Sequence, residues 1–547
     1  MAEKALIREE SEHPPIVTSE DTLERVGRTL ERPNTATEEG QLLTNSLPDH
    51  ARRKPRVTLW LVAAVSVSML GSGLPAGYCL GVINTPQEII RAWVKVVILE
   101  KYGLELSATA EVSLWAIIVA IFVGGAAVGA SCGAGLADRI GRRASFLVNH
   151  WLCICSALLL MACKTFGSVE MLIIGRFTSG LYSGLATCLV PLYLSEVVTA
   201  DLRGVMGVTF PLGLCTGLLF SQILGMESAL GTENGWPYLL GGYLVCVSIA
   251  VVLHPALPES PTYCYIILRD EVRGRKELCR LHRDNKYVEA EESSLRSLAV
   301  ISGVAQEGKA WSLSQVIQSR RGKMLLLITV LFNAGQQFSG INAVFYYSTL
   351  IFRSVGLDLY QSQCASIGAG AINCMMAILA MPLIKYFHRR VLLLTSVALC
   401  SLCQIVLMVS LNLIPTSPCA PFVAIVALMS YVLVYGMGLG PVPYMIATEL
   451  FPLGPRSIGI AVGGTSNWLC NLVVGLAFPL VQEVLGEWSF SIFIASSCLL
   501  FIFIYKFLPE THGKKEISLK QLSDEEEQES AEGTSTSSIE QGSSYSV

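Results

Sequence analysis

Long uninterrupted runs of apolar residues dominate the pattern of this chain. Twelve stretches of about 20 mostly apolar residues occur, the length that an α-helix needs to cross ~30 Å of hydrocarbon. They cover residues 57–80, 112–134, 145–163, 171–192, 205–224, 237–256, 324–350, 364–384, 391–414, 422–446, 457–481 and 489–507. Polar residues gather between these runs and at both ends. The pattern predicts an all-α membrane protein with twelve transmembrane helices.

Composition narrows the class of protein further. Of the 547 residues, 52% are hydrophobic and only 15% are charged, against about 25% charged residues in soluble domains. The basic residues are scattered between uncharged runs, which suits loops beside an anionic leaflet and does not suit a nucleic-acid surface. The chain has no G-x-x-x-x-G-K-[ST] phosphate loop and no H-E-x-x-H metal motif. We therefore expect neither an enzyme nor a cofactor or metal site.

The distribution of Lys and Arg predicts the orientation in the membrane. An even number of spans places both ends of the chain on one side. The six loops of the opposite side contain only Arg91, Lys95, Lys101, Lys164 and Arg353 as basic residues. By the positive-inside rule, both tails and the long connection 257–323 are then cytoplasmic.

Three short motifs recur at nearly one offset and indicate an internal duplication. The segment DRIGRR ending at Arg143 matches KYFHRR ending at Arg390, Glu196 and Arg203 match Glu449 and Arg456, and Pro258 matches Pro509. Two six-helix bundles of parallel topology follow, as in transporters that move two bundles about a midplane site. The expected domains are a disordered tail 1–56, a first bundle 57–256, an intracellular helical connection 257–323, a second bundle 324–507, and a tail 508–547 that is disordered from about 521.

Amide side chains cluster in the seventh apolar run. The cluster consists of Asn333, Gln336, Gln337, Ser339 and Asn342. An unpaired amide at membrane depth costs several kcal/mol, so these groups need partners or a wet cavity. Gln336 and Asn342 cannot share a face of a regular helix, and we expect the helix to loosen near Gly340. Hydrogen bonds between helices are the alternative explanation.

Two further runs carry unusual residues. The segment Gly436–Tyr444 holds three glycines and two prolines, which indicates a hinge or cavity lining, with a simple kink as the alternative. Asn467 and Trp468 would suit the polar edge and the apolar face of a sugar ring, although Trp468 could equally pack against lipid. The central parts of the runs contain no Asp, Glu or Lys, and Arg176, Glu196 and Glu449 are expected towards the cytoplasmic ends. Neutral polyhydroxylated solutes match such a pathway better than ions or protons.

Nine motifs in order resemble the facilitative glucose transporters of the major facilitator superfamily. The resemblance covers about residues 57–515. The motifs are GRFTSGLYSG from Gly175, PLYLSEV from Pro191, LRG from Leu202, PESP from Pro258, QQFSGINAVFYYS from Gln336, GPVPY from Gly440, ELFP from Glu449, SNW from Ser466 and LPETHGK from Leu508.

The resemblance implies a substrate site and a gate at residues of this chain. Hexose hydroxyls would bind to Gln336, Gln337, Asn342 and Asn373, with Asn467 and Trp468 beside them, and Tyr444 stands where an aromatic residue, commonly Trp, is found. A cytoplasmic ion-pair network that latches the outward-open state would consist of Arg142, Arg143, Glu196, Arg203, Glu449 and Arg456.

Besides Thr262, which stands where an Arg should follow PESP, three positions depart from the pattern of the family. Pro211 replaces a sugar-binding Gln, Gly436 replaces an acid, and Cys79 replaces an amide at about the place where proton-coupled relatives have an Asp. The resemblance implies facilitative uniport of a hexose, glucose and also fructose, across the plasma membrane by alternating access. A proton-coupled sugar or polyol symporter and a transport-inactive sugar sensor are the alternatives. Expected partners are a hexose and the lipid bilayer, and Tyr545, Ser546 and Val547 could bind a PDZ-type domain.

Overall fold

The computed structural model describes residues 58–199, 202, 205–282, 284–301, 312–451 and 455–508, and its regular secondary structure there is entirely helical. Ten segments in this part of the chain are long and apolar enough to cross a membrane, and one of them, Arg456–Phe507, contains two such helices. The shorter apolar helix Thr209–Leu224 adds the last span. The predicted fold class, twelve spans in an all-α membrane protein, is confirmed. The predicted tails and the PDZ-type end lie outside the described residues.

Six spans form the N-terminal half of the membrane region. They are α3, η2 and α4 in one span (Leu59–Ser68, Met69–Gly73, Leu74–Gly81), α6 (Ala108–Ile140), α7 (Arg142–Ala162), α8 (Val169–Val197), α10 (Thr209–Leu224), and α11 with α12 (Trp236–Leu240, Leu244–Leu253). Within this half, α8 packs between α6 and α7, and α4 packs on α10.

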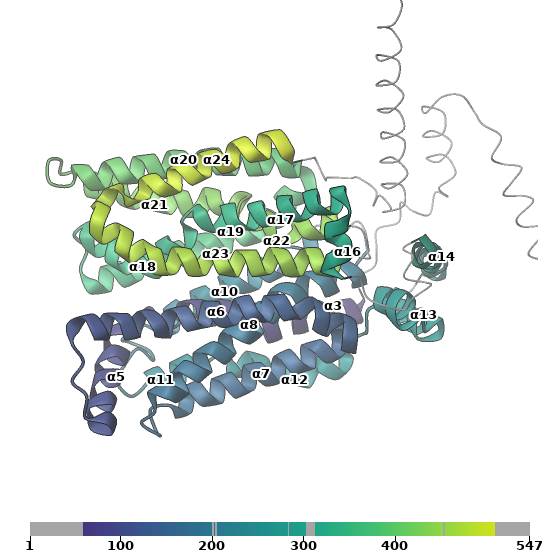
Figure 1. Cartoon of the computed structure of the whole chain (residues 1–547), viewed down its shortest axis with the longest axis horizontal. Coiled ribbons are helices and arrows are strands. Elements are labelled where there is room, and N and C mark those ends of the chain that lie inside the picture. Colours follow the sequence, from purple (N-terminus) through teal and green to yellow (C-terminus); the bar gives the residue numbers. More distant parts are fainter. Residues whose placement is uncertain are drawn as a thin grey trace, which may run out of the picture. The chain divides into compact units, whose positions relative to one another are not determined.

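The C-terminal half repeats this arrangement. Its spans are α17 with α18 (Arg320–Phe338, Ile341–Ser354), α19 (Leu359–Tyr386), α20 (Arg389–Leu413), α21 with α22 (Ala420–Met437, Val442–Leu450), α23 (Arg456–Leu485) and α24 (Phe490–Phe507). The two halves meet where α6 packs on α23 and α10 packs on α19. In Figure 1 the purple and blue helices of the first half lie beside the green and yellow helices of the second.

Small residues allow close contact between helices, which helix–helix packing inside a membrane requires. A Cβ added at Gly129 of α6 would overlap the carbonyl oxygen of Leu181, and one added at Gly180 of α8 would overlap that of Phe122. Because these contacts involve rigid backbone, even alanine does not fit without a shift of the helices. Gly129 and Gly180 therefore belong to the packing surface between α6 and α8.

Two spans are broken where the sequence predicts it. Gly340 has φ +87° and separates α17 from α18, so the seventh span does loosen there. The tenth span is interrupted between Met437 and Val442, at the run of glycine and proline. The fifth span begins only at Thr209, which places Pro211 in the first turn of α10. No N–H is needed from that position, so Pro211 does not kink the helix.

Helices between the spans mark the two ends of the membrane region. The amphipathic helix α5 (Gln87–Tyr102) packs on α6 and α8, lies across the helix ends in Figure 1, and was not predicted. The opposite end carries α13 (Glu271–Leu281), α14 (Asn285–Ile301) and α16 (Leu313–Gln318). Thr58 at the start of the first span donates to the carbonyl of Leu281, 3.0 Å away. The two ends are called the α5 end and the connector end below.

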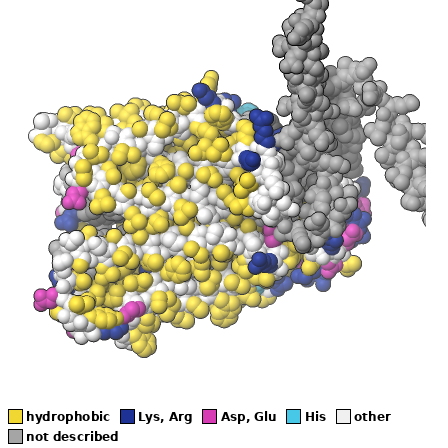
Figure 2. Space-filling view, viewed as in Figure 1, with side chains coloured by type: hydrophobic (Ala, Val, Ile, Leu, Met, Phe, Trp, Pro, Cys, Tyr) yellow, Lys and Arg dark blue, Asp and Glu magenta, His cyan; other side chains and the backbone are white. Residues whose placement is uncertain are grey.

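The outer surface matches a hydrocarbon environment. Large apolar side chains such as Val252, Phe422 and Leu499 are at least 69% exposed. Figure 2 shows one face covered by hydrophobic side chains, with the charged groups gathered towards its two ends. Such an apolar surface can contact lipid, because acyl tails are as apolar as leucine.

Candidate functional site

A cavity of about 640 Å³, open space at its mouth included, lies between the two halves. The described residues that line it are Leu80, Pro211, Leu214, Cys215, Leu218, Gln337, Ile341, Asn342, Phe345, Asn373, Ala377, Tyr435, Gly436, Gly440, Pro441 and Tyr444. None of them carries a carboxylate, ammonium, guanidinium or imidazole group. The described lining of the cavity therefore carries no formally charged group.

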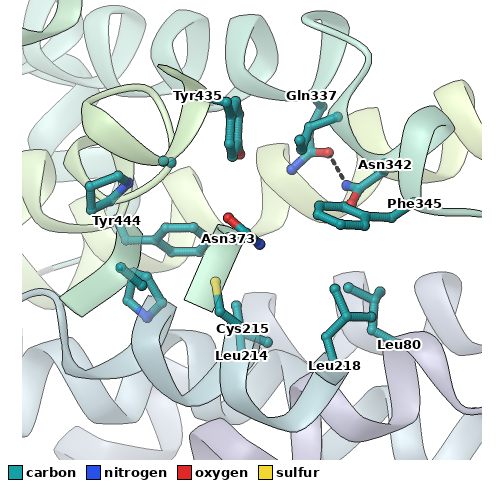
Figure 3. Close-up of a pocket in the computed structure, with 16 residues that line it drawn as sticks. Leu80, Leu214, Cys215, Leu218, Gln337, Asn342, Phe345, Asn373, Tyr435 and Tyr444 are labelled. Carbon is teal, nitrogen blue, oxygen red and sulfur yellow. Dashed lines mark hydrogen bonds between the residues drawn. The ribbon is translucent and has the colours of Figure 1, made fainter. Parts of the chain in front are cut away.

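Both pieces of the broken seventh span contribute an amide to the cavity. The Asn342 Nδ2 atom, in α18, donates to Gln337 Oε1, at the end of α17 (Figure 3). Gln337 Nε2 in turn donates to Asn467 Oδ1 of α23, 2.9 Å away. The break at Gly340 turns α18 so that two amides five residues apart in the sequence can face one space. In a regular helix the two amides would point in different directions and could not both face the cavity.

A second layer of amides lies behind the cavity wall. Asn467 Nδ2 donates to Gln336 Oε1 at 2.6 Å, and Gln336 Nε2 donates to the carbonyls of Leu439 at 2.9 Å and Gly440 at 2.8 Å. Those carbonyls are free because the tenth span is interrupted beside them. Gln336 and Asn467 are 0% and 1% exposed and do not line the cavity. In this conformation they hold the broken helices together.

Two polar groups face the cavity without a partner. The Asn373 amide of α19 and the Tyr435 hydroxyl of α21 make no hydrogen bond to any of the residues that the structure describes, and both line the cavity (Figure 3). Tyr435 was not predicted, because one aromatic residue in an apolar run gives no sequence signal. Both groups are available to hydroxyls of a bound solute.

Aromatic residues beside the site differ in their roles. Tyr444 of α22 lines the cavity and packs edge-on against Phe210 of α10, with ring centroids 5.5 Å apart. Trp468 of α23 is 3% exposed, and its Nε1 donates to Thr187 Oγ1 of α8 at 3.0 Å. Trp468 thus packs between the two halves and does not line the cavity in this conformation.

The three departures from the expected pattern have distinct places. Pro211 and Gly436 both line the cavity. A Cβ added at Gly436 would lie 2.6 Å from Met376 Cβ, so a larger residue there would need Met376 to shift. Cys79 is 0% exposed, lies 3.0 Å from the Tyr182 hydroxyl, and is not a lining residue.

Arg176 is not where the sequence suggested. It lies two turns into α8 from Val169, at the α5 end, because Glu170 in the first turn contacts Lys101 of α5 at 3.1 Å. Its guanidinium donates to the carbonyl of Cys79 at 2.8 Å and lies over the Phe122 ring. Its expected position towards the other end was wrong, because α8 runs from the α5 end to the connector end.

Ion pairs cluster at the connector end, where the gate residues were expected. Arg142 donates through two nitrogens to the two carboxylate oxygens of Glu196, both at 2.8 Å. In the second half, Arg389 contacts Glu449 at 3.2 Å. Arg143 donates to the carbonyl of Pro255 at 3.2 Å.

Arg456, the fifth described member of the expected gate, is 1% exposed and donates to the carbonyl of Phe451 at 3.3 Å. Arg203 lies outside the described residues.

Contacts between the halves lie on both sides of the cavity. At the connector end, Ser457 Oγ of α23 donates to Asp138 Oδ2 of α6 at 2.9 Å. At the α5 end, Asn84 Nδ2 donates to the carbonyl of Phe345 at 3.3 Å. A solute in the cavity would be enclosed by contacts that must break, on one side or the other, before it can leave.

Two parallel six-helix halves around a central cavity define a membrane transporter of the major facilitator superfamily. The fold resembles the proton:xylose symporter XylE bound to 6-bromo-6-deoxy-D-glucose, with a TM-score of 0.72 and 23% identity, over 85% of this chain and 99% of the other.

Residues 64–522 match the family model described as sugar (and other) transporter. The chain is 38% identical to facilitated glucose transporter member 4 of Bos taurus, covering 84% of this chain and 90% of that protein. It is 34% identical to member 5 of Equus caballus, over 87% and 94%. The chain belongs to the sugar transporters and, among them, to solute carrier family 2, the facilitated glucose transporters.

Proposed function

We propose that this protein carries a hexose, glucose and also fructose, across the plasma membrane by facilitative uniport, with both termini in the cytoplasm. The observation that carries the proposal is the cavity lined by neutral amides and tyrosines between two halves. Amides and phenols donate and accept hydrogen bonds without a charge to neutralise, which suits sugar hydroxyls. The relatives reported above are facilitated glucose transporters, which supports a hexose as the substrate.

The contacts on both sides of the cavity support transport by alternating access. A carrier must break Asp138–Ser457 to open at the connector end and Asn84–Phe345 to open at the α5 end. A contact made in one state only biases the equilibrium between states. The ion pairs of Glu196 and Glu449 would act in the same way as a cytoplasmic latch.

Uniport is proposed because no lining residue of the described chain holds a carboxylate or imidazole. Without a group that titrates in the cavity, proton binding has no means of changing sugar affinity. The test is uptake of labelled D-glucose into liposomes with the reconstituted protein. We expect saturable entry that discriminates against L-glucose, stops at equal concentrations, and ignores an imposed proton gradient. Concentrative uptake driven by the gradient would establish a symporter, and stereoselective binding without flux would establish a sensor.

Two neighbouring glutamines give a matched test of the site. Gln337 lines the cavity, whereas Gln336 is buried behind it with three hydrogen bonds. Gln337→Ala should weaken sugar affinity roughly tenfold, because it removes a hydrogen bond of about 0.5–1.5 kcal/mol and leaves a hydroxyl unpaired. Gln336→Ala should instead reduce the amount of folded protein while the surviving molecules bind sugar normally. Equal effects of the two variants on affinity would contradict the proposed site.

A further inference from the structure

The break in the seventh span leaves backbone groups that its own helix cannot pair. The last carbonyls of a helix have no partner within it, and inside a membrane they need partners from other helices. At this break the Ser339 carbonyl accepts from Gln404 Nε2 of α20 at 2.5 Å and from the Tyr431 hydroxyl of α21 at 2.8 Å. Both donors are at most 2% exposed, and neither lines the cavity. The break is therefore held by side chains outside the cavity lining.

The same helix, α20, also holds the break in the tenth span. Ser396 Oγ donates to the carbonyl of Val434 at 2.7 Å and accepts from the N–H of Leu439 at 3.1 Å. Val434 lies in the last turn of α21, and Leu439 lies in the interruption that follows. The backbone of this break packs directly on α20, because a Cβ added at Gly438 would be 2.6 Å from the carbonyl oxygen of Leu392. One side chain of α20 thus connects α21 to the interruption.

The geometry of α20 suits it to hold both breaks. It is an unbroken helix of 25 residues, so Ser396 and Gln404, eight positions apart, are separated by about 12 Å along its axis. Both side chains are buried, and neither lines the cavity. They can act on a solute only through the broken helices that they contact.

The two breaks serve opposite ends of the molecule. From its break, α18 extends to the α5 end, where Phe345 accepts the hydrogen bond from Asn84. From its break, α22 extends to the connector end, where Glu449 contacts Arg389. Movement of either piece changes the backbone angles at its break, which turns the group held by α20 away from its partner. Each hydrogen bond to α20 thus belongs to the state in which that end is closed.

We propose that Gln404 and Ser396 are positioning residues that set how readily the two ends open, with Gln404 restraining α18 at the α5 end and Ser396 restraining α22 at the connector end. The proposal rests on the proposed function, transport by alternating access. A hydrogen bond made only in the closed state biases the equilibrium against opening, so its loss favours opening at that end. Two residues of one helix should therefore shift transport in opposite directions, which a general loss of stability would not do.

The experiment compares sugar affinity from the two ends of the protein. Half-saturating D-glucose concentrations are measured from the α5 end and from the connector end, in sealed vesicles sorted by orientation. A carrier that opens more often to one side has a higher apparent affinity there and a lower one on the other side. Gln404→Met keeps the size of the side chain, removes the donor, and should lower the ratio of the α5-end to the connector-end concentration roughly threefold. Ser396→Ala should raise this ratio roughly threefold.

Three further variants serve as controls. Ser401→Ala is the matched one, because it removes a hydroxyl of α20 that donates within the helix, to the carbonyl of Val397 at 2.9 Å. It should keep the wild-type ratio, and so should Ser396→Thr, which retains the hydroxyl. Tyr431→Phe removes the second donor to the Ser339 carbonyl and should shift the ratio in the same direction as Gln404→Met. This variant keeps the test decisive if Gln404→Met fails to fold.

Ratios that move in the same direction in Gln404→Met and Ser396→Ala, or that keep the wild-type value in both, would overturn the proposal. A shift of equal size in Ser401→Ala would overturn it as well, because that hydroxyl contacts neither break. In each of these cases the wild type still transports glucose, so the proposed function stands. Absence of stereoselective glucose transport in the wild type would instead refute the proposed function.

Discussion

The duplicated arginine motif occurs once in each half, and the ion pairs of its two copies differ in length and exposure. Arg142 opens α7 and donates to the carbonyl of Ala137, five residues earlier. Arg389 opens α20 and donates to the carbonyl of Ile384, also five residues earlier. Each arginine also contacts the glutamate near the end of the fourth span of its half, Glu196 or Glu449.

The Arg142–Glu196 ion pair of the N-terminal copy is shorter and less exposed than the Arg389–Glu449 pair. The Arg142–Glu196 pair is bidentate at 2.8 Å, and both side chains are at most 4% exposed. Asp138 adds a second carboxylate at 3.1 Å. In the other copy, Lys385 stands where Asp138 would be, the Arg389–Glu449 contact is 3.2 Å, and Glu449 is 15% exposed.

The copy with the extra acid makes a hydrogen bond to the other half of the molecule. Asp138 accepts the hydrogen bond from Ser457, whereas a lysine at its place could not accept one. Each half thus has an arginine–glutamate pair, and Asp138 beside the first pair contacts the other half. The comparison teaches that the shorter and more buried ion pair is next to a contact between the two halves.

Arg142→Ala should have the largest effect. It leaves the carboxylates of Glu196 and Asp138 buried together without their cation, and breaking such a pair costs about 3–5 kcal/mol. We expect most of the protein to be lost from the membrane, measured as surface abundance and as melting temperature in detergent. Arg142→Lys is the control, because it keeps the positive charge and loses the bidentate geometry. Its abundance and melting temperature should lie between those of wild type and Arg142→Ala. If Arg142→Ala were as stable as wild type, the Arg142–Glu196 pair would have to be solvated.

Arg389→Ala should cost less, about 1.5–3 kcal/mol, because its contact is longer and its partner is more exposed. The same two measurements apply. A loss equal to that of Arg142→Ala would show that the two copies are equivalent in solution, against the geometry.

Ser457→Ala should leave stability nearly unchanged and alter transport. Removing the hydroxyl that donates to Asp138 takes away about 1 kcal/mol from the state closed at the connector end, which shifts the equilibrium roughly fivefold towards opening there. Accessibility of a cysteine introduced on the connector-end side of the cavity would report it. Ser457→Thr keeps the hydroxyl and should behave as wild type. An unaltered accessibility in Ser457→Ala would exclude this contact as part of the latch.

Lys385→Asp should have the smallest effect. It gives the C-terminal copy the acid that the N-terminal copy has. It places a carboxylate four residues before Arg389, as Asp138 stands before Arg142, and should stabilise the protein by about 0.3–0.5 kcal/mol. A rise in melting temperature of a purified sample would show it. Lys385→Asn, which adds no charge, is the control, and an equal rise there would assign the gain to loss of the lysine.

Local sequence was sufficient for the architecture of this protein. Each span follows from the transfer free energy of about 20 consecutive residues, so no knowledge of distant contacts is needed. The break at Gly340 was also predictable, because the amides on either side could not share a face of a regular helix. The helix α5 escaped prediction, since its charged residues hide an apolar face that only its contacts with α6 and α8 reveal.

The tertiary structure alone decided which amides face the cavity. Gln336 and Gln337 are adjacent and chemically identical, yet one binds the freed carbonyls of the tenth span and the other lines the cavity. That choice depends on how α17 is rotated against α21–α22 and α23, which the sequence of α17 does not encode by itself.

The same limit applies to contacts between distant parts of the chain. Asp138 and Ser457 are 319 residues apart and neither stands out in its motif, so their pairing was not foreseen. The apolar composition of a segment sets whether it enters the membrane, because lipid acts on each segment separately. Which polar side chains meet inside is set by the packing of twelve such segments, and that packing exists only in the folded protein.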